Sequence, residues 1–334
     1  MRVLYLLSIL LLSLSSCDKK VCKTPVDHYI SEGILISNEG NFQWGNASVS
    51  FYDTENDILI ESVFQEVNNR LLGDVLQSIT IDGDFAYLVL NNSARIEVVN
   101  KNSFELVGSI TGFISPRYIH IVNNEKAYVS DLYSNKIAVV DLVSLEITNY
   151  IDCTGWTEEM HQLNNEVYVL NKTENSLYKI DVATDAITSV LVLDFEVNSF
   201  KIDSQSRLWL AGSKNDIGIV ECMNPQSGEI EYSYNFVGEN PSELYVSESG
   251  SDVYFLSNGV WHINEFTDEI ISVPIIPANE RLFYGLSVHQ EKIYIADAIN
   301  YVQQGTVWLY DLQATLLQEF KVGIIPSEFY FINP

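Results

Sequence analysis

The histidines are the first side chains in this sequence that could do chemistry. His120, His161 and His289 each fall in the opening strand of a repeated unit that is set out below, and imidazole is the commonest metal ligand among side chains. These three rings could bind a metal ion only if all of them pointed inward at one level. Side chains alternate along a strand and the three registers differ, so a hydrogen-bonded channel histidine is the alternative interpretation.

Acidic side chains are the second candidates for chemistry. Asp74, Asp131 and Glu158 fall at one end of the repeated unit, where a hydrolase would need convergent carboxylates. The chain has 45 acidic residues, however, so three at one end are unremarkable. The sequence has no Gly-x-Ser-x-Gly, His-Glu-x-x-His or phosphate-binding loop motif. We therefore predict no catalytic residues and no enzyme.

A repeat of about forty residues positions all of these side chains. An aromatic residue in a short apolar strand recurs with spacings of 41, 40, 41, 45 and 40 residues, at Tyr87, Tyr128, Tyr168, Trp209, Tyr254 and Tyr294. In one period, residues 116–122, "AYVSD", 136–142 and 146–151 predict four strands joined by short polar turns. Forty residues with four antiparallel strands are typical of a propeller blade. A β-sandwich, the alternative, gives no reason for a fixed period.

The order of the strands predicts seven blades. Six complete units begin near Val75, Pro116, Glu158, Val197, Pro241 and Leu282. Before them, "GILISNEG", "SVSFYD" and "ILIESVF" supply the second, third and fourth strands of a unit that lacks its first. Residues 328–333 resemble a first strand with nothing after it. We predict one all-β domain, residues 29–334, in which the C-terminal strand completes the first blade and leaves no open edge.

One face of such a propeller carries the longer and chemically more varied loops, and we expect function there. Aromatic rings with amides and guanidinium groups suit a large, flat, polar-edged small molecule or the surface of another protein. For each aromatic residue, packing between neighbouring blades is the alternative. The predicted ligand-binding residues are Phe42, Trp44, Asn46, Arg70, Asp74, Asn92, Arg117, Tyr133, Trp156, Arg281, Tyr284 and Tyr301.

The first 16 residues predict a signal peptide. Arg2 precedes a mostly apolar run, residues 3–14, that is too short to span a bilayer. The run ends in "LSSC", which resembles the bacterial lipobox and predicts cleavage before Cys17 and lipid attachment to Cys17. Residues 17–28 would form the lipidated end and a polar tether. An ordinary signal peptide is the alternative.

The net charge limits the kinds of partner that we expect, and the spacing of the cysteines argues against disulfides and a zinc site. Lys and Arg number 18 against 45 acidic residues, a formal charge of −27, and removing Arg2 with the signal peptide makes it −28. Such a chain is repelled by nucleic acid and by anionic membrane surfaces, so we expect membrane association through the lipid anchor alone. The other cysteines, Cys22, Cys153 and Cys222, have no Cys-x-x-Cys spacing and predict neither a disulfide framework nor a zinc site.

Four stretches carry a family resemblance. "WGNASVSFYD", "LGDVLQSITI", "NNSARIEVV" and "SPRYIHIV…KAYVSDLYSNKIAVVD" resemble the YncE-like, BtuG-type surface lipoproteins, and the similarity is strongest over residues 33–151. The resemblance implies a seven-bladed propeller at the outer membrane, facing the cell surface. Proteins of this type capture cobalamin and pass it to a TonB-dependent transporter, on which they sit as a lid. "CTGWTEEM" departs from the pattern, because Glu158 stands where the third unit has a proline.

We therefore expect a binding protein whose ligand is a corrinoid (vitamin B12) and whose partner is a TonB-dependent transporter. The corrinoid would be cargo, and we predict no resident cofactor and no protein-bound metal, although a channel histidine as an axial cobalt ligand is conceivable. The alternatives are capture of a siderophore or a glycan, a protein-interaction module, and a propeller hydrolase.

Overall fold

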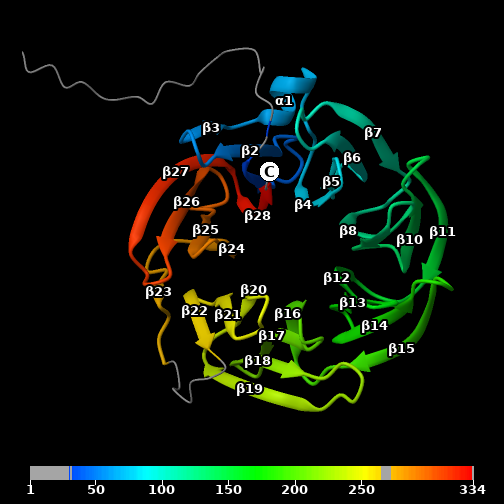
Figure 1. Cartoon of the computed structure of the whole chain (residues 1–334), viewed down its shortest axis with the longest axis vertical. Coiled ribbons are helices and arrows are strands. Elements are labelled where there is room, and N and C mark those ends of the chain that lie inside the picture. Colours follow the sequence, from blue (N-terminus) through cyan, green and yellow to red (C-terminus); the bar gives the residue numbers. More distant parts are fainter. Residues whose placement is uncertain (1–29, 31, 265–271, 333–334) are drawn as a thin grey trace, which may run out of the picture.

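The computed structural model describes residues 30, 32–264 and 272–332. Its strands form seven four-stranded antiparallel sheets that stand like blades around a central channel (Figure 1). The fold class and the blade count predicted from the sequence are confirmed. The proposed signal peptide, the lipidation site Cys17, the tether and Cys22 lie outside the described residues.

Every blade has the same strand order from the channel outward. The innermost strands are β28 (Pro326–Ile332), β4 (Leu76–Asp82), β8 (Pro116–Asn123), β12 (Thr157–Leu163), β16 (Glu196–Ile202), β20 (Ser242–Val246) and β24 (Phe283–His289). The second strands are β1 (Gly33–Asn38), β5 (Phe85–Leu90), β9 (Lys126–Asp131), β13 (Glu166–Asn171), β17 (Leu208–Lys214), β21 (Asp252–Leu256) and β25 (Lys292–Asp297).

The two outer positions complete each blade. The third strands are β2 (Ser48–Asp53), β6 (Arg95–Asn100), β10 (Lys136–Asp141), β14 (Ser176–Asp181), β18 (Ile217–Met223), β22 (Gly259–Asn264) and β26 (Gln304–Asp311). The outermost strands are β3 (Ile58–Ile60), β7 (Leu106–Thr111), β11 (Glu146–Asp152), β15 (Ala186–Val192), β19 (Ile230–Val237), β23 (Ile276–Pro277) and β27 (Leu316–Ile324).

The first blade joins the two ends of the described chain. Strand β28 pairs antiparallel with β1, with Ile34 opposite Phe331 and Ile36 opposite Phe329. The hydroxyl oxygen of Ser37 accepts a hydrogen bond from the backbone N–H of Glu328 at 3.0 Å. This pairing confirms the prediction that the C-terminal strand supplies the missing inner strand of blade one.

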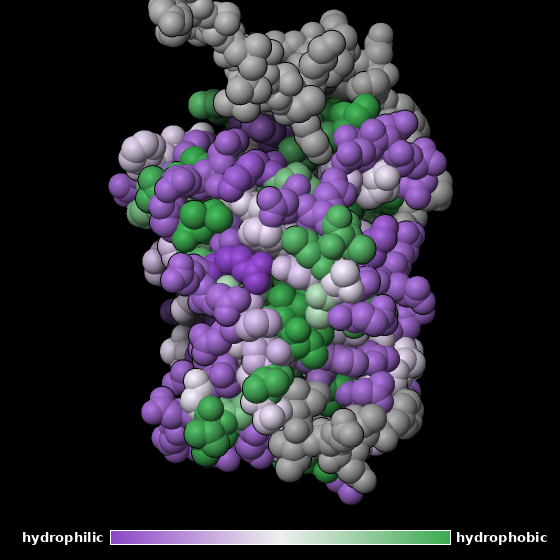
Figure 2. Space-filling view, turned by 90° about the vertical axis from the view of Figure 1, so that its left-hand side faces the viewer, coloured by the Kyte–Doolittle hydropathy of each residue, from purple (hydrophilic) through white to green (hydrophobic). Residues whose placement is uncertain are grey.

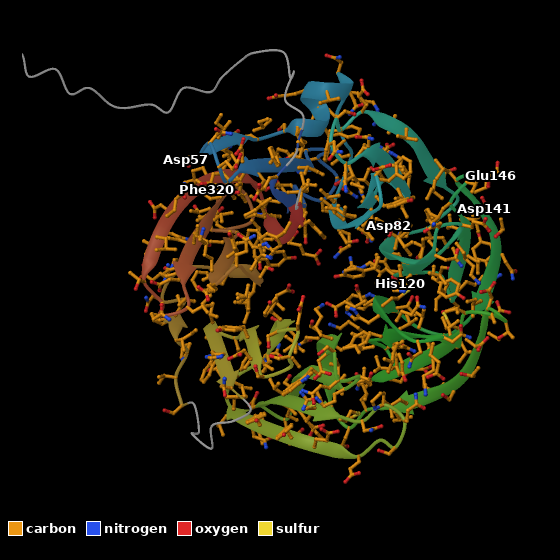
Figure 3. All side chains as sticks on the ribbon, viewed as in Figure 1. Asp57, Asp82, His120, Asp141, Glu146 and Phe320 are labelled. Atoms are coloured by element: carbon orange, nitrogen blue, oxygen red, sulfur yellow. The ribbon has the colours of Figure 1, made fainter. Side chains whose placement is uncertain are left out.

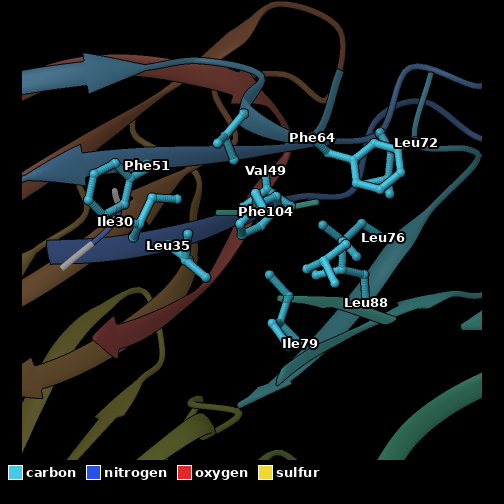
Figure 4. Packing of buried hydrophobic residues seen from close by; sticks show 14 of the residues in the cluster. Ile30, Leu35, Val49, Phe51, Phe64, Leu72, Leu76, Ile79, Leu88 and Phe104 are labelled. Carbon is cyan, nitrogen blue, oxygen red and sulfur yellow. The ribbon is translucent and has the colours of Figure 1, made fainter. Parts of the chain in front are cut away.

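The hydrophobic core lies between the blades. Among the described residues, the buried apolar side chains form seven clusters, one at each interface between neighbouring blades. Figure 4 shows part of the cluster between blades one and two, to which Phe64 and Phe104 contribute. The six recurring aromatic residues of the sequence are buried in these clusters. The sequences of the second strands are nearly continuous apolar runs, because side chains on both faces of these strands pack against neighbouring blades.

Asparagine and aspartate residues fix the turns between the third and fourth strands. The Oδ1 atom of Asp141 accepts hydrogen bonds from the backbone N–H groups of Val143 and Ser144, at 2.9 and 2.7 Å. Such a side chain satisfies the turn backbone and stabilises it locally. The same position is occupied in other blades by Asp53, Asn100, Asp181, Asn224 and Asp311.

Blade one differs from the prediction in its outermost strand. "ILIESVF" was predicted to be one strand, but β3 ends at Ile60 and a short helix, α1 (Val63–Asn68), follows it. Val63 and Phe64 are fully buried in the cluster between blades one and two. The helix ends at Asn69, whose left-handed backbone (φ 53°) suits asparagine. A six-residue helix is too short to give a helical period in the sequence.

One side of the ring has a mainly polar outer surface (Figure 2). On the side of the ring that carries β26 and β27, hydrophilic residues cover most of the surface, with hydrophobic side chains between them (Figure 2). In the described part of the chain, no helix has the length and apolar character needed to cross a membrane.

Ring closure should be sensitive to one glycine of blade seven. A Cβ atom on Gly285 would lie 1.5 Å from the backbone oxygen of Ser327 in β28, a strand that β1 holds in register. We expect Gly285→Ala to lower the free energy of unfolding by about 3 kcal/mol or more, the upper end for overpacking. Thermal unfolding followed by circular dichroism measures the effect as a drop in Tm.

Gly83→Ala is the matched control for ring closure. An added Cβ at Gly83 meets no atom within 4 Å, and only its left-handed backbone (φ 54°) is disfavoured, at about 1–2 kcal/mol. Equal losses of stability in the two variants would contradict a special role for the contact between β24 and β28.

Candidate functional site

The loops that follow the second and fourth strands of the blades meet on one face, which we call the rim face. It carries Trp44, Tyr133 and Phe42, which are 77%, 72% and 62% exposed. Trp44 and Phe42 lie in the β1–β2 loop and Tyr133 lies in the β9–β10 loop. Further exposed apolar residues of this face are Leu71, Ile114, Tyr301 and Val302. These seven residues, which we call the aromatic sector, come from blades seven, one and three and from the loops leading into blades two and three. Val192 and Val237, at the ends of β15 and β19, are exposed on the same face elsewhere in the ring.

Several predicted site residues contact one another in this sector. The side-chain amide of Asn41 donates to the backbone oxygen of Tyr301 at 2.5 Å and accepts from Asn46 at 3.2 Å. The ring of Tyr284 packs edge-on against Tyr301, with ring centroids 5.7 Å apart. Asn92 donates to Asp74 at 2.6 Å. The β1–β2 and β25–β26 loops therefore support each other beside the channel.

A second group surrounds Trp156 at the entrance to the channel. Arg117 Nε donates to Glu158 Oε1 at 2.8 Å, and the indole N–H of Trp156 donates to the same oxygen. The guanidinium carbon of Arg117 lies 5.8 Å from the Trp156 ring centroid, and Lys172 Nζ lies 5.7 Å from it. The indole ring is thus held by two cations and one carboxylate. Glu158, the departure from the repeat pattern, is the buried partner of Arg117.

Two connected cavities lie below this entrance. The upper one, the channel mouth, has a volume of about 210 Å³ and is lined by Arg117, Trp156, Glu39 and Tyr284 among others. The lower one, the channel cavity, has a volume of about 320 Å³. Both are bounded by side chains of the inner strands, and they share Tyr118, Glu159, Glu243 and Glu328.

Carboxyl groups dominate the electrostatics of the two cavities. Burial, together with the neighbouring Glu328 carboxyl, raises the pKa of Glu243 to about 8. Burial also raises the pKa values of Glu39 and Glu328 to about 7, although each carboxyl has a tyrosine hydroxyl as hydrogen-bond partner. The pKa of Glu158 is raised by burial as well, against the opposing charge of Arg117.

The three candidate histidines are not gathered into one site. His120 lies at the inner edge of the ring (Figure 3) and its Nε2 is 3.1 Å from Gln162 Oε1. His161 packs edge-on against Phe200, and His289 stacks on Phe331 with centroids 4.0 Å apart. Burial lowers the pKa of each imidazole. Among the described residues, no group of three or more His, Cys, Asp or Glu side chains could hold a metal ion.

Two predicted arginines are held by neighbouring side chains. Arg70 Nη2 lies 3.0 Å from Glu97 and its guanidinium stacks on Phe64. Arg281 donates to the Tyr310 hydroxyl at 2.8 Å and stacks on Phe283. Both side chains hold loops in place, while Arg117 faces the channel mouth. The assignment of all twelve residues to ligand binding stays a prediction.

Sequence reasoning did not find the channel acids Glu39, Glu159, Glu243 and Glu328. A signal for two of them was present, because "PSE" opens an inner strand twice, at 241–243 and 326–328. The repeated acid at the start of an inner strand indicates a side chain near the axis. Cys153 and Cys222 line neither cavity, and burial raises the pKa of the Cys153 thiol to about 11.

Comparisons with known proteins agree with the fold. A family model described as a domain of unknown function, DUF5074, matches residues 32–251, more than half of the chain. No curated protein matches the chain.

Solved structures similar to this chain are propellers of low sequence identity. A quinonprotein alcohol dehydrogenase-like protein from Bacteroides thetaiotaomicron has a TM-score of 0.74 and 16% identity, over 92% of this chain and 80% of that one. A protein from Lactobacillus plantarum has a TM-score of 0.70 and 13% identity, over 90% and 99%. A functionally unknown protein from Desulfotomaculum acetoxidans has a TM-score of 0.66 and 12% identity, over 91% and 99%. At these identities the likeness supports the fold alone.

The channel acids should make stability depend on pH. Their folded pKa values of about 7 to 8 lie above the ordinary value of 4.5, so the folded state binds more protons than the unfolded state. The free energy of unfolding should therefore fall as the pH rises from about 4.5 to about 8. Glu243 has the highest pKa of these acids, so it contributes most to the change between pH 7.0 and 8.5.

We expect Glu243→Gln to raise Tm at pH 8.5 by a few degrees and to reduce the difference in Tm between pH 7.0 and 8.5. Differential scanning calorimetry at these two values measures it. Glu146→Gln, on the outer edge of the ring (Figure 3), is the control and should follow the unchanged protein. A Tm that rises from pH 7.0 to 8.5 would show that the channel acids do not carry this effect.

Proposed function

This chain belongs to the DUF5074 family, and we propose that it is a binding propeller that captures a corrinoid on its rim face. The observation that carries the proposal is the exposed aromatic sector around Trp44, Tyr133 and Phe42. Isolated apolar side chains are common on protein surfaces, but several large exposed rings on one face favour a binding site there. The sector borders a polar channel mouth, which gives a ligand both flat apolar contacts and hydrogen-bonding groups.

A corrinoid matches this combination of surfaces. Its macrocycle is large and flat, and amide groups line its edge. Trp44 and Tyr133 offer ring faces for the macrocycle, and Arg117, Asn46 and Asn92 offer donors for the amide oxygens. The contacts between Asn46, Asn41 and the Tyr301 loop hold part of the sector rigid before a ligand binds, which reduces the entropic cost of binding.

The position of the N-terminal segment is compatible with capture at a membrane. The backbone N–H of Ile30 donates to the oxygen of Asn102 at 2.8 Å, in the β6–β7 turn on the face opposite the rim. If Cys17 is lipidated at the outer membrane, the twelve residues between it and Ile30 span at most about 45 Å. The anchor then leaves the rim face free for a ligand and for a TonB-dependent transporter that receives it, with display on the cell surface.

Isothermal titration calorimetry with cyanocobalamin tests the proposal directly. We expect saturable binding, and at least a tenfold higher Kd for Trp44→Ala and for Tyr133→Ala, because each removes a large exposed ring from the contact. The control is Tyr150→Ala, which removes an exposed ring from the outermost strand β11 and should leave Kd unchanged. Absence of heat at micromolar ligand would overturn the corrinoid assignment.

Other outcomes separate the remaining functions. Binding of a siderophore or a glycan, with the same loss in the Trp44 and Tyr133 variants, would keep the site and change the ligand. Turnover on ester and lactone panels, with and without calcium, would replace capture by hydrolysis.

A further inference from the structure

Asp131, the last residue of β9, connects two loops of the rim face. The loop before β8 (112–115) carries Ile114, and the loop after β9 (132–135) carries Tyr133. Both of these exposed residues belong to the aromatic sector. Asp131 itself is only 3% exposed, so its side chain is buried in the protein while a residue of each loop faces the solvent.

Each oxygen of the Asp131 carboxyl group holds one of the two loops. Oδ2 accepts hydrogen bonds from the backbone N–H groups of Ile114 at 3.0 Å and Ser115 at 2.9 Å. Oδ1 accepts hydrogen bonds from the backbone N–H groups of Tyr133 at 2.9 Å and Ser134 at 3.0 Å. One buried side chain therefore satisfies four backbone donors, two in each loop.

Neighbouring blades fix the position of Asp131 and of the loop before β8. The backbone N–H of Asp131 donates to the hydroxyl oxygen of Thr157 at 3.2 Å, in the inner strand of blade four. The side-chain amide of Asn91, in blade two, donates to the Ser115 hydroxyl at 2.9 Å and to the backbone oxygen of Pro116 at 3.2 Å. Contacts from three blades therefore hold the two loops.

The corresponding residue of blade four shows why blade three needs an aspartate. Asn171, the last residue of β13, also accepts from the loop after its strand, from the N–H groups of Thr173 at 3.0 Å and Glu174 at 3.3 Å. Toward the loop before β12, its amide donates to the backbone oxygen of Thr154 at 3.0 Å. That loop presents a carbonyl group, whereas the loop before β8 presents two N–H groups. An ionised carboxylate accepts on both sides, and an amide does not.

Blade seven has a similar arrangement at the other end of the aromatic sector. Asp297, the last residue of β25, is buried. Its Oδ1 atom accepts from the backbone N–H groups of Leu282 at 3.1 Å and Ile299 at 2.9 Å. Leu282 precedes β24, and Ile299 lies in the loop that carries Tyr301 and Val302. A buried aspartate thus joins two rim loops in blade seven as well.

We propose that Asp131 is a positioning residue of the rim face, because it holds Ile114 and Tyr133 in one arrangement before a ligand binds. Loops that are already ordered lose little conformational entropy on binding, which raises affinity. Because it is buried, Asp131 acts through the two loops and not by contact with the ligand. The effect on affinity rests on the proposed function of the rim face, whereas the ordering of the loops does not.

Substitutions of Asp131 should loosen the two loops stepwise. Asp131→Asn keeps one acceptor oxygen and turns its NH₂ group toward the N–H groups of the other loop, so one loop should loosen. Asp131→Ala removes both acceptors, so both loops should loosen. Hydrogen–deuterium exchange of the ligand-free protein, read by mass spectrometry in peptides that cover 112–115 and 132–135, measures this. We expect exchange in a loosened loop to be faster by about tenfold or more, because buried N–H groups without acceptors favour local opening.

Calorimetric titration with cyanocobalamin measures the consequence for binding. We expect Kd to rise by about tenfold or more in Asp131→Ala and by a smaller factor in Asp131→Asn. Circular dichroism verifies that both variants are folded. Loosened loops with an unchanged Kd would overturn the positioning role, and so would unchanged exchange in Asp131→Ala. Absence of cyanocobalamin binding by the unchanged protein would overturn the corrinoid assignment, and the exchange rates alone would then decide whether Asp131 orders the loops.

Asp141 provides the matched controls on the opposite face. It also holds a turn, but its Oδ1 atom accepts from both Val143 and Ser144, and asparagine keeps that oxygen. Asp141→Asn should therefore leave exchange in the turn unchanged, and Asp141→Ala should loosen the turn and lower Tm. Neither variant should change Kd or exchange in the rim loops. An equal rise in Kd in Asp131→Ala and Asp141→Ala would show that general destabilisation sets the affinity, and this would overturn the proposal.

Discussion

The antiparallel pairing of β28 with β1 is the constraint on which the rest of the structure depends. It joins residues that are about 300 positions apart, such as Ile34 and Phe331, and it gives the first blade its inner strand. Without it, the first blade would present an unpaired strand edge, and the interface between blades seven and one would lose Phe329. Because the ring is closed, all seven interfaces are packed and the inner strands are held at fixed distances around the axis.

Polar contacts between neighbouring inner strands are a consequence of this closure. The Ser78 hydroxyl donates to the backbone oxygen of Arg117 at 2.7 Å, and the Thr80 hydroxyl donates to that of Ile119 at 2.9 Å. These residues are 39 positions apart, one repeat along the chain. Inner strands of different blades share no backbone ladder, so side chains satisfy the exposed backbone groups. The channel wall therefore carries many polar groups, and the acids placed there are half-buried.

The features that could be predicted from the sequence are those that follow from strand patterns and from the repeat period. The forty-residue spacing of Tyr87, Tyr128 and the later aromatics gave the blades, and the incomplete first unit gave the closure. It did not predict α1, because six residues that bury only Val63 and Phe64 leave no helical period. It also did not predict the channel acids. Glu243 and Glu328 are 85 positions apart, and only ring closure brings them into one cavity.

The sequence also could not show which of the predicted charged side chains are already paired within the protein. Arg70 and Arg281 lie in loops before an inner strand, and Arg117 lies at the start of one, yet Arg70 pairs with Glu97 and Arg281 bonds to Tyr310. Arg117 alone of the three lines the channel mouth. Its ion pair with Glu158 is largely buried, and removing either partner would leave a desolvated charge. The aromatic sector and the channel thus differ in polarity and in exposure. The first exposes apolar rings to solvent, and the second gathers half-buried carboxyl groups around the channel.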